Sequence, residues 1–168
     1  MRVHASAPVS RLVRHLPVGL PTATPLQMSF SVEWVPVRGV ELSEKTVLIV
    51  EDDPASLDIF ATILRHGGYL VETAQSGTEG LEKARELIPD VVVVDIGLPD
   101  GLGFGVLDEL SDDPSTEHIP LIVCTVHVFE HDQVRARRAG ADVFVTKPVE
   151  PTHLLECVNR VLQAAPAP

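Results

Sequence analysis

The segment Val47-Leu-Ile-Val-Glu-Asp-Asp53 decides the fold, because it joins a short apolar run to a run of acids. Four consecutive apolar residues are typical of a strand that is buried on both faces of a sheet. Pro54 follows directly and suits the first turn of a helix. The segment 54–66 carries its apolar residues at helical spacing on one face, which is made of Leu57, Phe60, Ala61 and Leu64. Gly67-Gly68 is then expected to end the helix.

The alternation of apolar strand and amphipathic helix repeats along the chain. Further strands are predicted at 69–74, 91–94, 121–124 and 143–146, and further helices at 78–87, 104–110, 129–139 and 151–163. In the second helix, Leu81, Ala84 and Leu87 are expected to face inward. This pattern predicts an α/β fold with a five-stranded parallel sheet and helices on both faces. With right-handed crossovers, the leading strand order is the flavodoxin-like order 2-1-3-4-5.

Residues that can carry chemistry follow several of the predicted strands. In this strand order a crevice opens at the carboxyl ends of the first and third strands, where the chain reverses direction. The residues at the ends of strands one, three, four and five are Glu51, Asp52 and Asp53, then Asp95, Thr125 and Lys147. Carboxylates gathered at one crevice repel one another unless a cation neutralises them. Oxygen ligands without a nearby His or Cys favour Mg²⁺ over zinc.

Each of these residues also has an ordinary structural explanation. Asp52 or Asp53 could cap the helix that starts at Pro54, Asp95 could be a loop acid, and Lys147 could be a solvated surface lysine. Their joint placement at one crevice favours a functional site over three separate explanations.

Four blocks of the sequence resemble the signature blocks of the receiver domain of bacterial response regulators. They are Leu48-Ile-Val-Glu-Asp-Asp53, Val92-Val-Val-Asp-Ile-Gly-Leu-Pro99, Val123-Cys-Thr125 and Val145-Thr-Lys-Pro148. The resemblance covers residues 45–164. It implies that Asp95 accepts a phosphoryl group from a sensor histidine kinase or a histidine phosphotransfer protein. It also implies a Mg²⁺ site with direct ligands and one water-mediated ligand, namely Asp52, Asp95, the Gly97 backbone carbonyl and, through water, Glu51.

The resemblance further implies a switch around the phosphoryl group. Lys147 would pair with Asp95 and then with the phosphoryl oxygens, and the Thr125 hydroxyl would move onto the phosphoryl group. Phe144 would change rotamer with it and remodel the face formed by the fourth helix, the fifth strand and the fifth helix. A downstream protein target would read that face, and phosphorylation-dependent homodimerisation is one possible outcome. Asp53, one position beyond the acidic pair, is expected to be the helix cap.

Some positions depart from the family pattern. Val126 stands where the family usually has Ala or Gly, and we expect it to obstruct small phosphodonors or to slow the attack of water. His127 is expected to modulate dephosphorylation. Leu102 occupies a loop position where an acid is common. Cys124, inside a strand, is expected to be a packed thiol rather than a redox centre.

Length and charge limit the remaining possibilities. The chain has 168 residues and a net charge of −11, which disfavours direct contact with nucleic acid. No apolar run approaches the roughly 20 residues that span a bilayer, and two cysteines do not make a disulfide framework. A cytoplasmic, bacterial location follows as the expectation. Residues 1–44 are expected to be a disordered leader and linker, with a transit peptide as the rival interpretation of the first 30 and Met28 as a rival start. Residues 165–168 are expected to be a tail, which leaves a stand-alone receiver.

Three rival functions make different demands on the sequence. A phosphatase of the haloacid dehalogenase type needs a second Asp two residues after its nucleophile, where this chain has Gly97. A flavodoxin-like FMN carrier needs a Ser-, Thr- and Gly-rich loop after the first strand, and Glu51-Asp-Asp-Pro54 would repel a phosphate. A degenerate receiver that acts only as a protein-interaction scaffold remains the alternative, with Val126 in its favour. The main interpretation is not an enzyme, beyond slow self-dephosphorylation.

Overall fold

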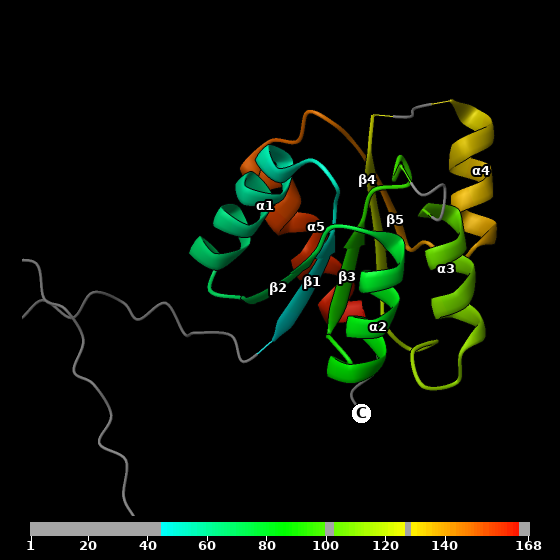
Figure 1. Ribbon diagram of the computed structural model, residues 1–168. Helices are drawn as coiled ribbons and strands as arrows, with labels where there is room; N and C mark the ends of the chain where they lie inside the picture. Colours follow the sequence, from blue (N-terminus) through cyan, green and yellow to red (C-terminus); the bar gives the residue numbers. More distant parts are fainter. Residues whose placement is uncertain (1–44, 100–102, 127–128, 165–168) are drawn as a thin grey trace, which may run out of the picture. The chain divides into compact units, whose positions relative to one another are not determined.

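The computed structural model describes residues 45–99, 103–126 and 129–164. These residues form a parallel sheet that is flanked by helices (Figure 1). The strands are β1 (Thr46–Val50), β2 (Leu70–Ala74), β3 (Val91–Val94), β4 (Leu121–Thr125) and β5 (Val143–Thr146). The helices are α1 (Pro54–His66), α2 (Gly77–Leu87), α3 (Gly103–Asp112), α4 (Glu130–Arg138) and α5 (Pro151–Ala164). The expectations for residues 1–44 and 165–168 lie outside the described residues.

The strand order is β2-β1-β3-β4-β5, and every pair of neighbouring strands is parallel, so the predicted topology is confirmed. The register places Val50 of β1 beside Val94 of β3. One residue later, the Asp95 N–H donates to the Val50 carbonyl at 2.9 Å. Glu51 and Asp95 therefore leave two neighbouring strands at the same level of the sheet.

The sheet is covered by apolar side chains on both faces. On one face α1 and α5 pack against β-strand residues, and on the other face α2, α3 and α4 do so (Figure 1). All four residues of β3, from Val91 to Val94, are buried. This burial explains why the strand is a continuous run of valine without a polar face.

Local contacts fix the loops that follow β1 and β3. The Asp53 carboxylate accepts the Ser56 N–H at 2.8 Å, and Pro54 occupies the first turn of α1, so the predicted cap is confirmed. The first residue of α3, Gly103, packs directly on the backbone of Ile96. A Cβ atom at Gly103 would lie 2.4 Å from the Ile96 Cα and carbonyl oxygen, so only glycine fits there.

The second helix differs from the sequence prediction at its end. Leu81 and Ala84 are buried as expected, but Leu87 is 41% exposed and was wrongly assigned to the inward face. The reason is that α2 ends at Leu87 and that Ile88 adopts a left-handed conformation with φ 45°. The last turn of α2 therefore lies at the margin of the core.

The start of β2 also differs from the prediction. The strand begins at Leu70, one residue later than expected, because Tyr69 belongs to the turn after α1. The Tyr69 hydroxyl donates to the Asn159 side chain on α5 at 2.6 Å, and burial raises the pKa of this tyrosine. Tyr69 thus joins the edge of the sheet to α5.

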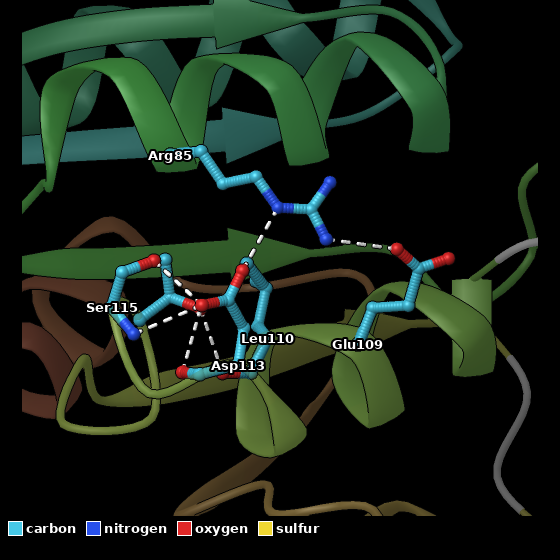
Figure 2. A network of polar contacts seen from close by, with 6 residues as sticks. Arg85, Glu109, Leu110, Asp113 and Ser115 are labelled. Atoms are coloured by element: carbon cyan, nitrogen blue, oxygen red, sulfur yellow. Dashed lines mark hydrogen bonds and ion pairs between the residues drawn. The ribbon is translucent and has the colours of Figure 1, made fainter.

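An ionic network links α2 to α3 and to the loop after α3. Figure 2 shows Arg85 between two acids, with its Nε 3.0 Å from Asp113 and its Nη2 3.0 Å from Glu109. Asp113 also accepts hydrogen bonds from the N–H and hydroxyl of Ser115, at 2.9 and 2.7 Å. These bonds from Ser115, and then the Arg85 guanidinium, lower the pKa of Asp113 to about 2.

None of the helices in the described ranges has the length and hydropathy required to span a bilayer.

Candidate functional site

Lys147 lies between two buried carboxylates at the carboxyl edge of the sheet. Its ammonium donates to Oδ2 of Asp95 at 2.5 Å and to Oε2 of Glu51. Glu51 and Asp95 are only 2% and 7% exposed, and the Lys147 side chain is largely buried as well. The structure therefore brings together three of the residues that the sequence placed at strand ends.

The register of the sheet brings Lys147 to the two acids. Thr125 at the end of β4 lies beside Thr146 at the end of β5, and the Lys147 N–H donates to the Thr125 carbonyl at 2.9 Å. The strand order is β1-β3-β4-β5 in this part of the sheet, and all these strands are parallel. Their carboxyl ends therefore lie along one edge, where they line one crevice.

Backbone amides orient the two carboxylates. The Gly97 N–H donates to Oδ1 of Asp95 at 2.7 Å, so both oxygens of Asp95 are held. The Asp53 N–H lies 3.4 Å from Oε1 of Glu51, a longer contact of the same kind. Because Gly103 packs against the loop after β3, that loop and its Gly97 amide are fixed relative to Asp95. We predicted Gly97 only as a carbonyl ligand, and its amide donor was missed.

The charges at the crevice do not balance. Burial raises the pKa of Glu51, and the nearby Lys147 lowers it by less. Burial acts to lower the pKa of Lys147, but the hydrogen bonds that its ammonium donates to Asp95 and Glu51 outweigh burial, so the pKa is raised. One ammonium thus faces two carboxylates, and exposed Asp52 adds a third acid next to Glu51. This excess of negative charge favours a cation.

The donor set suits a cation that keeps much of its water. Within the described ranges, no group of three His, Cys, Asp or Glu side chains is placed to hold a metal ion. A structural zinc site takes about four such ligands, whereas Mg²⁺ binds through one or two carboxylates and retains several waters. The carboxylates of Asp52 and Asp95, with the exposed Gly97 as a source of a carbonyl oxygen, fit Mg²⁺ in this respect.

Of the residues predicted to form the switch, Thr125 lies at this crevice and Phe144 lies within β5. Thr125 is fully buried at the end of β4, and Phe144 of β5 lies beside Val123 and packs against the core on the α2, α3 and α4 face. Val126 follows Thr125 and is 63% exposed. His127 lies outside the described residues, and its predicted role stays a prediction.

Cys124 lies one position before Thr125 and is 1% exposed. Burial raises the pKa of its thiol to about 12, as expected for a packed thiol.

The sequence did not indicate that α1 also contributes to the crevice. The Lys147 Nζ lies 5.6 Å from the centroid of the Phe60 ring. Phe60 was predicted only as a core residue on the inward face of α1, and it is indeed buried. Helical periodicity identifies the inward face, but it carries no signal for a contact with a residue 87 positions away.

Comparison with known proteins identifies the family of the chain. Residues 47–159 match the family model described as response regulator receiver domain. The polar-differentiation response regulator DivK of Brucella ovis is 34% identical over 118 residues, which cover 70% of this chain and 96% of DivK.

Solved structures have the same fold. A CheY-like response regulator receiver domain protein from Methanospirillum hungatei is 35% identical, with a TM-score of 0.69 over 73% of this chain and 97% of that one. The receiver domain of a sensor histidine kinase from Pseudomonas aeruginosa is 23% identical, with a TM-score of 0.67 over 72% of this chain and 99% of that one. Its structure has a magnesium ion coordinated in the active site cleft. The chain belongs to the response regulator receiver domain family.

Proposed function

We propose that Asp95 accepts a phosphoryl group from a sensor histidine kinase or a histidine phosphotransfer protein, in a reaction that requires Mg²⁺. The observation that carries this proposal is the placement of Lys147, whose ammonium contacts both Asp95 and Glu51 at the carboxyl edge of the sheet. Membership in the receiver family supports the same assignment.

The chemistry requires positioning more than a strong nucleophile. A carboxylate oxygen of Asp95 forms the new bond to phosphorus, while the bond from phosphorus to the donor histidine nitrogen breaks and its electron pair stays on that nitrogen. Lys147 supplies positive charge beside Asp95, and the Gly97 amide fixes the carboxylate. When bound, Mg²⁺ would neutralise the charge of the phosphoryl oxygens as they approach the acids.

The proposed ligands of Mg²⁺ are residues around Asp95. Asp52 and Asp95 would bind directly together with the Gly97 carbonyl, and Glu51 would bind through water. The exposure of Asp52 and Gly97 supports direct binding, because both are accessible to an ion from solvent. The burial of Glu51 behind the Lys147 contact supports an indirect role.

Phosphorylation would be read as a change of surface. A phosphoryl group on Asp95 adds charge and strong acceptors, and the Thr125 hydroxyl would donate to it. The space that Thr125 leaves would admit Phe144, which remodels the face of α4, β5 and α5. A downstream protein would bind that face, or the phosphoryl group would pass on in a relay.

The test is intact-mass analysis after incubation with Mg²⁺ and an acyl-phosphate or phosphoramidate donor. The expected result is one added phosphoryl group in the wild type and none in Asp95→Asn. If the wild type stays unchanged, the same assay is run with Val126→Ala, which widens access, and with a phosphorylated histidine kinase as the donor. No phosphoryl group under any of these conditions would favour the scaffold function.

A further inference from the structure

The Lys147 ammonium has a third neighbour besides its two carboxylates. Its Nζ lies 5.6 Å from the centroid of the Phe60 ring, within the range of about 6 Å for a cation–π contact. Phe60 is only 5% exposed and belongs to the core cluster between the sheet and the helices α1 and α5. The ring is therefore held in place by packing, and Lys147 is the flexible partner.

Two hydrogen bonds do not fix an ammonium group at the end of a long side chain. Bonds to Glu51 and Asp95 leave Nζ free to swing about the line that joins the two accepting oxygens. The four-carbon stem of lysine permits that movement, and its rotatable bonds carry substantial entropy. A third contact from the face of a rigid ring removes this freedom. A cation–π contact is also stronger when the cation is largely desolvated, as Lys147 is.

We propose that Phe60 is a positioning residue, whose ring face holds the Lys147 ammonium where it reaches Asp95 and Glu51 together. For phosphoryl transfer, this inference rests on the function proposed above. For the order of the ammonium group it stands on the geometry alone. Phe60 follows Asp53 and Pro54 on the same continuous segment as Glu51, so α1 would connect the acidic loop to the lysine that follows β5.

The competing explanation is that Phe60 only fills the core. Phe60→Leu removes the ring but keeps an apolar side chain, so it confounds the two roles when used alone. Replacement of Phe60 by trifluorophenylalanine keeps the ring and nearly its volume while it weakens the negative charge of the ring face. Leu64→Val is the matched control, because Leu64 lies one turn further along the same buried face of α1.

The first experiment measures the Lys147 ammonium itself by ¹H–¹⁵N NMR relaxation, without any donor. We expect a lower order parameter in Phe60→Leu and in the trifluorophenylalanine protein than in the wild type, and no change in Leu64→Val. An ammonium group that is equally ordered with both replacements would overturn the proposal. If Phe60→Leu does not fold, the fluorinated protein decides alone.

The second experiment measures the rate of phosphorylation by an acyl-phosphate donor at saturating Mg²⁺. We expect about a fivefold lower rate in the fluorinated protein, which corresponds to the loss of one such contact. Leu64→Val should keep the wild-type rate. Equal rates in the fluorinated and wild-type proteins would contradict the inference. If no phosphoryl group is taken up from this donor, in Val126→Ala or from a phosphorylated histidine kinase, the proposed function fails, and the NMR result still decides the role of Phe60.

Discussion

The Lys147 ammonium lies 2.5 Å from Oδ2 of Asp95, although 52 residues separate the two positions in the sequence. The same ammonium donates to Glu51, so a single cation is shared by two buried carboxylates. Sharing stabilises the pair of acids, but it leaves one negative charge without a partner in a largely buried position. The proposed chemistry and the stability of this edge of the sheet both depend on this imbalance.

Removal of the shared cation should destabilise the protein. Lys147→Met leaves Glu51 and Asp95 buried without an ammonium, and breaking such an arrangement costs on the order of 3–5 kcal/mol of unfolding free energy at pH 7. Urea unfolding measures the loss. The matched control is Lys45→Met, because Lys45 forms an exposed ion pair with Asp90 and should contribute little. Equal losses in the two variants would contradict the prediction.

The loss in Lys147→Met should also depend on pH. Burial raises the folded-state pKa of Glu51 above its unfolded value, so the folded protein takes up a proton there more readily than the unfolded chain does. As the pH falls through the folded-state pKa of Glu51, protonation of its carboxylate removes the repulsion with Asp95. The difference between Lys147→Met and wild type should therefore shrink in acid. A constant difference between pH 7 and pH 4 would be inconsistent with this explanation.

Mg²⁺ should stabilise the folded protein through the acids at the crevice. At a concentration one hundred times its dissociation constant, a ligand that binds only the folded state adds about 2.7 kcal/mol. The melting temperature should therefore rise with Mg²⁺, and Asp52→Asn should reduce the rise. The control is Asp58→Asn, which removes an exposed acid on α1. If both variants show the wild-type shift, Mg²⁺ acts only as a general salt.

The network in Figure 2 predicts that the pKa of the Asp113 carboxyl group is lowered. Its carboxyl carbon should titrate by NMR with a pKa of about 2, below the ordinary 3.8. Ser115→Ala and Arg85→Gln should each raise this pKa, because each removes a hydrogen bond that lowers it. Since the folded pKa is lowered, the contribution of Asp113 to stability is complete above pH 3.8 and is lost as the pH falls through 2. A wild-type pKa near 3.8 would contradict the observed contacts.

The end of α2 contains strain that a substitution can remove. Ile88 has φ 45°, a left-handed conformation that is unfavourable for a β-branched residue, and its side chain is 41% exposed. Ile88→Gly should raise the free energy of unfolding by about 1 kcal/mol. Ile88→Ala loses the same apolar contacts but keeps a Cβ atom, so it should show no comparable gain. A glycine variant that is no more stable than the alanine variant would refute this assignment.

The parts of the site that follow from strand register could be predicted from the sequence. Buried parallel strands leave little choice of register, so the residues after them, such as Glu51, Asp95 and Lys147, meet at one edge. The cap at Asp53 was also predictable, because its signal is local and Pro54 marks the helix start.

Other contacts have no such signal. Ile88 adopts a left-handed conformation, which usually falls on glycine or asparagine. The sequence pattern therefore does not indicate that the helix ends before Ile88 and that Leu87 is exposed. The sequence offers several acids as partners for Arg85. Its pairing with Asp113 and Glu109 follows from the packing of α3 beside α2. The contact of Phe60 with Lys147 requires knowledge of how α1 sits on the sheet.

The central claim is that Asp95 carries the phosphoryl group. The most direct measurement is reduction of the phosphorylated protein with borohydride, which converts an acyl phosphate to an alcohol, followed by peptide mapping by mass spectrometry. The account predicts a single reduced residue at position 95, formed only when Mg²⁺ is present during phosphorylation. A reduced residue at Asp52 or Asp53, or a phosphorylated protein with no reducible acyl phosphate, would contradict it.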